Sequence, residues 1–190
     1  DLKCDVDNKH PLYIPRFGSE TAMDTSYDDV QNFGYGPTES YIDKHLACRI
    51  GRYHAKVADL YNDYIRPQEN GNHHATEWAA VRNASGEGIV LCSEQPFEFQ
   101  ALPYTAEEME AAEHSYKLYK PAVTAVRFDY QVSGMGSHSC GPEVSEKYRV
   151  PAQFTMRVKI RGIHGGQKPV VIANTVYDGD NAEDFGQLTL

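Results

Sequence analysis

The amino-acid sequence predicts an all-β protein, an antiparallel β-sandwich that carries one short helix at about 106–115. Three observations predict this fold class. Short segments of alternating apolar and polar residues recur along the chain, and clusters of Gly, Pro, Asn and Asp separate them. No strand alternates with a helix as in a parallel α/β sheet. The 13 Tyr and 7 Phe among 190 residues also agree with a chain rich in strands.

The first third of the chain contains two predicted strands. A short one is expected at Tyr13–Phe17, and a longer one at residues 46–57, where the apolar alternation slips and Gly51 indicates a bulge. Phe33–Pro37 lies between them and reads Phe-Gly-Tyr-Gly-Pro. We expect this segment to be a turn, since Gly and Pro interrupt regular elements.

A hairpin is predicted in the middle of the chain. Ala75–Arg82 and Gly88–Cys92 have the alternation of its two strands, and residues 83–86 (Asn-Ala-Ser-Gly) supply the turn between them. Phe97–Ala101 is a further predicted strand, in which two polar residues alternate with three apolar ones.

One helix is indicated by its N-terminal residues. Thr105 can cap it, and Glu108 completes a capping box with that threonine. Tyr104 and Met109 stand at the positions of a hydrophobic staple. These residues predict a helix from Ala106 to about Ser115.

The last third contains two strongly alternating segments. Val123–Val132 places Val126, Phe128 and Tyr130 on one face, and residues 154–160 place four apolar residues on one face. We expect both sets to face the same core. Val170–Val176 is a further strand candidate, because it is rich in Val and Ile.

Composition excludes several classes of protein. The formal net charge of −9 and the pI of about 5.3 disfavour binding to a nucleic-acid backbone. No apolar run approaches the roughly 20 residues that a membrane helix needs. The chain begins with Asp1 and shows no signal peptide, so we expect a processed product or a piece of a longer polypeptide.

The four cysteines do not form a metal-binding pattern. No CxxC spacing occurs among Cys4, Cys48, Cys92 and Cys140, so the sequence gives no support for a zinc site. Cys48 and Cys92 lie in apolar segments and are expected to be buried small hydrophobic residues. A reduced, intracellular protein fits this pattern, and a disulfide remains open.

Candidate catalytic residues are few. The carboxylates in turn-rich segments are Glu39, Asp43, Glu69 and Glu143, but the sequence pairs no two of them as a glycosidase requires. We expect such loop carboxylates to accept backbone N–H groups instead. His138, Ser139 and Cys140 are adjacent in a Gly-rich loop, and neighbours in a loop rarely form a catalytic dyad. His73 and His74 would point to opposite faces of a strand and are not expected to bind a metal together.

Four segments, in this order, resemble family 2 β-galactosidases. Pro15–Gly18 matches the P-R-x-G of that family, and residues 33–44 (FGYGPTESYIDK) resemble its GxGPxExYxDR segment. Residues 64–72 (YIRPQENGN) resemble its Y-[IV]-x-P-x-E-N-G stretch. Residues 134–142 (GMGSHSCGP), the late loop, resemble its G-x-G…S-[WC]-x-P loop. The order and spacing are similar to those of the last domain, domain 5 or the β-galactosidase small chain.

The resemblance implies a galactose-mutarotase-like sandwich that belongs to a larger enzyme. It implies that residues 1–163 are a partial C-terminal sandwich domain and leaves residues 164–190 as an unassigned extension. It also implies that the catalytic glutamates lie in a (β/α)₈ barrel absent from this chain. The isolated fragment is therefore expected to be inactive, although the parent is a retaining glycosidase for terminal β-D-galactosides such as lactose.

The resemblance also implies where this domain meets the substrate. In the family, an aromatic residue of the late loop packs beside the sugar in the leaving-group subsite, and Cys140 holds that position here. His138 and Ser139 are the neighbouring candidates for the rim of this subsite. No catalytic residue is expected in the chain. A thiol offers far less stacking area than an indole.

Partners and cofactors are likewise implied by the resemblance. The expected partners are the catalytic barrel and other domains of the parent, a galactoside and further copies of the parent; nucleic acid and membranes are not expected. No cofactor is expected in this fragment, since the family commonly binds Mg and Na outside this domain. A cytoplasmic location is expected, with a secreted or periplasmic parent left open. The alternative function is a stand-alone carbohydrate-binding β-sandwich.

Overall fold

The structure is a computed structural model that describes residues 2–5, 13–119, 121–136 and 141–175. Its strands are β1 (Leu2–Asp5), β2 (Arg16–Met23), β3 (Asp29–Gly36), β4 (Arg49–Lys56), β5 (His73–Arg82), β6 (Gly88–Leu102), β7 (Thr124–Val132), β8 (Gln153–Met156) and β9 (Val158–Ile163). Its helices are α1 (Val57–Leu60), α2 (Ala106–Ala111) and α3 (Pro169–Asn174), with short 3₁₀ turns at Ser115–Lys117 and Glu146–Tyr148.

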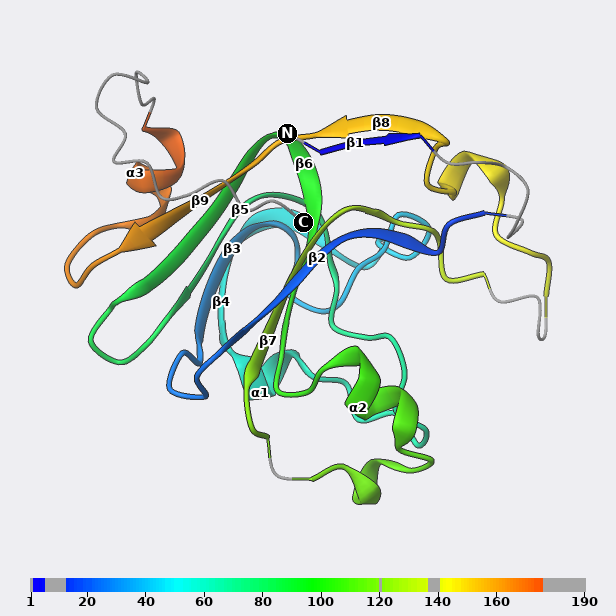
Figure 1. The fold of residues 1–190 in the computed structure, drawn as a ribbon, viewed down its shortest axis with the longest axis horizontal. Helices are drawn as coiled ribbons and strands as arrows, with labels where there is room; N and C mark the ends of the chain where they lie inside the picture. The colour runs from blue at the N-terminus through cyan, green and yellow to red at the C-terminus, as the bar shows by residue number, and fades with distance from the viewer. Residues whose placement is uncertain (1, 6–12, 120, 137–140, 176–190) are drawn as a thin grey trace.

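Two antiparallel sheets make up the fold. The larger has seven strands, in the order β2-β7-β6-β5-β3-β4, and β9 pairs with the first half of β6. The smaller pairs β1 with β8. Figure 1 shows the larger sheet strongly twisted, with α1 and α2 at one end and the β1–β8 pair at the other. The predicted antiparallel all-β class is thus confirmed.

The main core lies on one face of the larger sheet. It includes the fully buried Phe97 and Phe99 of β6 and Val126 of β7, so the alternation predicted for these strands is confirmed. The small sheet contributes Met156 to the same cluster. Two sheets therefore face one core, as in a sandwich.

An aromatic cluster joins the two sheets. Phe154 of β8 stacks on Tyr130 of β7, with ring centroids 4.1 Å apart, and meets Phe17 of β2 edge-on at 4.8 Å. The alternation of residues 154–160 fails at its end, however, because Ile160 is 46% exposed. The chain leaves β8 at Arg157 and enters β9, which pairs with a different sheet.

The segment expected to be a turn at Phe33–Pro37 is mostly strand. β3 pairs with β4 along its whole length and with β5 over residues 29–33. Its glycines accommodate neighbours: a Cβ at Gly36 would lie 2.6 Å from the ring of Tyr53. The bulge expected at Gly51 is also wrong, because Gly34 and Gly51 pair within an unbroken register.

Residues 88–92 and 97–101 belong to the single long strand β6. The hairpin between β5 and β6 is confirmed, since Asn83 and Glu87 close the turn through a backbone hydrogen bond of 2.8 Å. The expected strand at 170–176 is wrong: Pro169 begins α3, whose Ile172 and Ala173 pack on Ala80 and Val90. Packing on the sheet here outweighs the strand preference of Val and Ile.

The helix predicted at 106–115 is α2, and its N-terminus is confirmed. Thr105 and Glu108 form both hydrogen bonds of the capping box, and Met109 is buried. The helix ends at Ala111, four residues earlier than expected. The chain then turns so that the Ser115 amide donates to the carbonyl of Ile65, a tertiary contact that the local sequence does not indicate.

Within the described part of the chain, no helix has the length and apolar character needed to cross a membrane. Cys48 and Cys92 are buried, as predicted, and both are free thiols.

Candidate functional site

The four motif segments converge at one end of the larger sheet. We call this convergence the loop junction and define it by residues 14–18, 33–44, 62–72 and 133–136. The start of the late loop is tied to the first segment, because the amide of Ser133 donates to the carbonyl of Pro15 (2.8 Å) and its hydroxyl to that of Ile14 (2.7 Å). Segments about 120 residues apart in sequence are thus adjacent in space.

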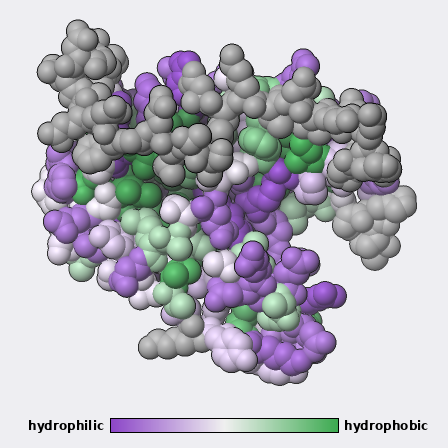
Figure 2. All heavy atoms as spheres, in the orientation of Figure 1, coloured by the Kyte–Doolittle hydropathy of each residue, from purple (hydrophilic) through white to green (hydrophobic). Residues whose placement is uncertain are grey.

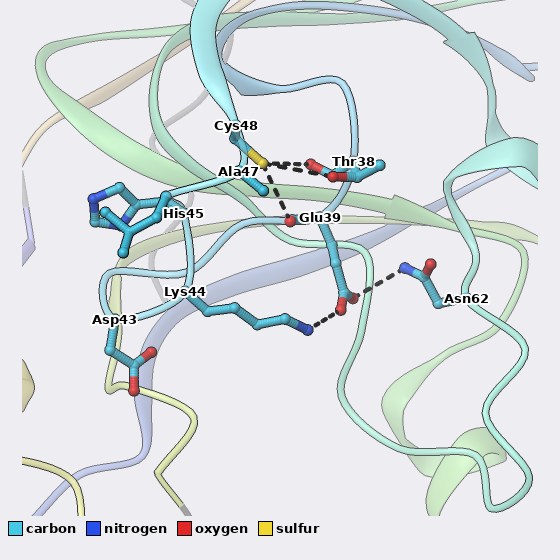
Figure 3. A pocket seen from close by; sticks show the side chains of 9 residues that line it. Thr38, Glu39, Asp43, Lys44, His45, Ala47, Cys48 and Asn62 are labelled. Atoms are coloured by element: carbon cyan, nitrogen blue, oxygen red, sulfur yellow. Dashed lines mark hydrogen bonds and ion pairs between the residues drawn. The ribbon is translucent and has the colours of Figure 1, made fainter.

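Glu39 connects the second and third segments. Its carboxylate accepts four hydrogen bonds, from Lys44 Nζ (2.5 Å), Tyr64 OH (2.6 Å), the Gly71 amide (2.8 Å) and Asn62 Nδ2 (3.0 Å). Figure 3 shows this carboxylate between Lys44 and Asn62. Burial alone would raise the pKa of Glu39, but its hydrogen bonds outweigh that effect and hold the pKa below its ordinary value.

The backbone conformation at position 71 explains why the third segment carries a glycine there. Its φ of +71° lies in the left-handed region, where side chains are strained. A Cβ there would also lie 2.7 Å from the carbonyl oxygen of Leu60 and from a methyl group of Leu102. The close approach lets the Gly71 amide reach Glu39.

Asp43 connects the second segment to the late loop. Its Oδ1 accepts the amide of Met135 (2.9 Å), and its Oδ2 accepts the amide of Gly136 (3.2 Å). Asp43 points away from the Lys44–Glu39 pair (Figure 3). The expectation that loop carboxylates accept backbone N–H groups is therefore correct for Glu39 and Asp43.

Glu69 does not follow that expectation, because it accepts only side-chain donors among the hydrogen bonds of the described residues. These are Arg16 Nη1 (2.6 Å), Gln100 Nε2 (2.8 Å) and Tyr41 OH (3.2 Å). Burial, reinforced by the Glu69 carboxylate, raises the pKa of Tyr41, which is fully buried. Glu143, the remaining candidate, ion-pairs with Arg149 at 3.3 Å near the surface.

Arg16, from the P-R-x-G segment, bridges Glu69 and Asp129. Burial alone would lower the pKa of Arg16, but these two carboxylates raise it above its ordinary value. For Asp129 burial dominates and raises the pKa, against the attraction of Arg16.

These groups belong to a polar layer on the face of the larger sheet opposite the main core. Its members are buried polar side chains from neighbouring strands: Glu98, Gln100, Arg127 and Asp129. Gln100 Oε1 accepts from Arg127 Nη1 at 2.5 Å, and Arg127 also pairs with Glu20 of β2. Hydrophilic side chains gather in the middle of the face seen in Figure 2, over β2 and β7.

The polar layer extends to His74. Glu98 accepts from Asn72 Nδ2 at 2.5 Å and lies 2.6 Å from His74 Nδ1. His73 lies on the core side, near Phe99, and burial lowers its pKa. The two histidines therefore face opposite sides, as expected.

A cleft of about 510 Å³ lies beside the loop junction (Figure 3). Its lining includes Glu39, Asp43, Lys44, Cys48 and Asn62. The polar groups of Glu39 are already occupied by the chain's own donors. In the described residues, no three His, Cys, Asp or Glu side chains are grouped so that they could hold a metal ion.

The predicted rim residues His138, Ser139 and Cys140 lie outside the described residues. The described structure gives the anchor of their loop, at Ser133–Gly136. The polar layer is what the sequence analysis missed. Its signal was present, since two polar residues alternate with aromatic ones in β6 and two charged residues, Arg127 and Asp129, do so in β7.

Sequence comparison assigns the family. The family described as "Beta galactosidase small chain" matches residues 1–160, which is most of the chain. The motifs that meet at the loop junction all lie within this match. The chain belongs to the β-galactosidase small-chain family.

Three relatives illustrate the match. A β-galactosidase of Actinobacillus pleuropneumoniae is 38% identical over 146 residues, or 76% of this chain and 14% of the relative. That of Kluyveromyces lactis is 36% identical over 146 residues (75% and 14%), and that of Staphylococcus xylosus 33% over 150 residues (79% and 15%). The chain thus spans about one seventh of the length of these relatives and corresponds to one part of them.

Proposed function

We propose that this chain is domain 5, the C-terminal domain, of a family 2 β-galactosidase that hydrolyses terminal β-D-galactosides such as lactose with retention of configuration. The family match and the small share of each relative that the chain covers support this proposal. Retention needs two carboxyl groups about 5–5.5 Å apart. We assign both to a barrel domain of the parent, and the isolated chain is inactive.

The role of the domain is to complete the rim of the active site and to stabilise the enzyme. The observation that carries this proposal is the anchoring of the late loop by Ser133 and Asp43, which fixes both the backbone direction and the position of its first residues. His138, Ser139 and Cys140 follow directly in sequence and form the rim of the leaving-group subsite. In this proposal the sandwich is of galactose-mutarotase-like type, and residues 164–190 are an extension of it.

The barrel and the other domains of the parent are the principal partners, and the parent forms homo-oligomers. Any Mg and Na of the parent would bind in those other domains and not in this chain. The location is cytoplasmic, which agrees with the free thiols of Cys48 and Cys92.

The test uses the full-length enzyme with Cys140→Trp. An indole in the leaving-group subsite strengthens acceptor binding by about 0.5–1.5 kcal/mol. Transfer of the galactosyl group to glucose should therefore increase relative to hydrolysis of an aryl galactoside. Equal effects on both reactions, or none on either, contradict the assignment of the late loop to that subsite.

A second candidate function is a stand-alone carbohydrate-binding module. The aromatic content favours it, since the faces of Tyr and Phe rings, of which the chain has 13 and 7, can stack on the apolar face of a sugar. Calorimetry of the isolated chain with galactose and lactose separates the two proposals. Millimolar or tighter affinity supports the module, and no binding supports the domain of a larger enzyme.

A further inference from the structure

We propose that Asp43 is the positioning residue that sets the late loop for the acceptor sugar, a role that rests on the proposed function. Its two carboxylate oxygens accept consecutive backbone amides, those of Met135 and Gly136. Two bonds from one side chain fix both the position and the direction of the backbone. Hydrogen bonds to an ionised acceptor are also stronger than neutral ones.

The glycine at 134 is an independent observation for the same contact. A Cβ built at Gly134 would lie 2.4 Å from Asp43 Oδ2 and 2.6 Å from its carboxyl carbon. The backbone at Gly134 therefore lies directly against this carboxylate. A residue larger than glycine could stay there only if Asp43 moved away.

Asp43 itself lies in a two-residue turn that is closed by hydrogen bonds. Tyr41 and Lys44 exchange backbone hydrogen bonds of 2.9 Å in both directions, with Ile42 and Asp43 between them. Tyr41 is fully buried and its hydroxyl donates to Glu69, while Lys44 pairs with Glu39. The turn is thus attached to the polar layer on one side and to Glu39 on the other. This arrangement holds the Asp43 carboxylate in place before substrate binds, which is the condition for accurate positioning.

The first test measures the contact directly, by amide hydrogen exchange of the full-length enzyme followed by mass spectrometry. Asp43→Asn replaces one acceptor oxygen by an NH₂ group that cannot accept. Exchange of the peptide containing Met135 and Gly136 should rise about tenfold or more, because each lost bond lowers the cost of local opening. The matched control is Asp59→Asn, an exposed carboxylate in α1. Unchanged exchange in Asp43→Asn overturns the proposal.

The second test measures how the galactosyl group divides between glucose and water. This ratio does not depend on the fraction of enzyme that is folded, so a purely structural defect does not change it. Asp43→Asn should lower transfer to glucose relative to hydrolysis by about fivefold, since displacements near 1 Å can cost on the order of 100-fold in a positioned reaction. Asp59→Asn should leave the ratio unchanged.

A double-mutant cycle isolates the pair. Gly134→Ala should impair transfer in the wild-type background, where the new methyl group meets the Asp43 carboxylate. In the Asp43→Ala background it should add little, because the carboxylate is gone. Additive effects overturn the proposal.

The outcomes also separate this proposal from the proposed function. If Cys140→Trp changes the ratio and Asp43→Asn does not, the late loop forms the rim but Asp43 does not position it. If neither changes the ratio while exchange at Met135 increases, the contact exists but the rim assignment is wrong, and the positioning role fails with it.

Discussion

Replacing Glu39 by Gln should destabilise the loop junction, because the Glu39 carboxylate connects two of its segments. The Glu39 side chain is 8% exposed and accepts four hydrogen bonds, two on each oxygen. A glutamine keeps one acceptor oxygen and presents an NH₂ group at the other position. When the oxygen faces Asn62 and Gly71, the NH₂ group faces Lys44 and Tyr64.

The magnitude follows from the bonds that are lost. Hydrogen bonds to charged groups contribute about 1.5–3 kcal/mol each. The bond to Lys44 contributes less, because the Lys44 side chain is 53% exposed and can turn into solvent. The sum is a loss of about 2–4 kcal/mol in the free energy of unfolding.

Urea unfolding followed by fluorescence measures this loss, with Glu77→Gln as the matched control. Glu77 lies exposed on β5 and should change stability by less than about 0.5 kcal/mol. With ordinary slopes, the midpoint of Glu39→Gln should fall by roughly 1–2 M. Equal midpoints for the two variants would refute the assignment of Glu39 as the connector of the two loops.

The pH dependence gives the same prediction a second readout. Because the pKa of Glu39 is lowered in the folded state, its contribution to stability is present at neutral pH and is lost as the pH falls through that lowered value. Glutamine does not titrate. The difference in stability between wild type and Glu39→Gln should therefore shrink as the pH is lowered, and a constant difference contradicts the argument.

Three further predictions concern the core, the polar layer and the chemistry. Phe128→Ala should lower stability by about 3–5 kcal/mol, whereas Ile160→Ala, at a half-exposed position, should lower it by less than about 1 kcal/mol. Equal losses in calorimetric unfolding would contradict the placement of Phe128 in the core and of Ile160 at the surface. Burial raises the pKa of Asp129 in the folded state, so the contribution of Asp129 to stability should weaken as the pH rises from its ordinary pKa through the raised value. Urea unfolding of wild type and Asp129→Asn over a pH series measures this contribution. A stability difference in favour of wild type that grows with pH contradicts the argument. The isolated chain should not hydrolyse a nitrophenyl β-galactoside. Turnover that is abolished by mutating one of its own glutamates would overturn the assignment of both catalytic carboxyl groups to the barrel.

Much of the site could not be predicted because its contacts join distant segments. The motifs identified all four segments that meet at the loop junction, and Glu39 and Asp43 accept backbone amides as expected. Glu69 and Arg16, by contrast, are more than 50 residues apart, and no local pattern indicates that they pair. Such contacts are decided by how the strands are ordered in the sheet, which the alternation within one strand does not specify.

The sequence by itself determined the all-β class, the capping box of Thr105 and Glu108, and the inward faces of β6 and β7, because these depend on residues within a few positions of one another. Only the tertiary structure decided what lies on the opposite face. Glu98, Gln100, Arg127 and Asp129 have the alternation of solvent-facing residues, yet they are buried. The start of β2 and the loop at residues 62–72 bring partners to this face, among them Arg16 for Asp129 and Glu69 for Gln100. Buried polar groups are stable only where such partners meet, and the fold brings those partners from distant parts of the chain.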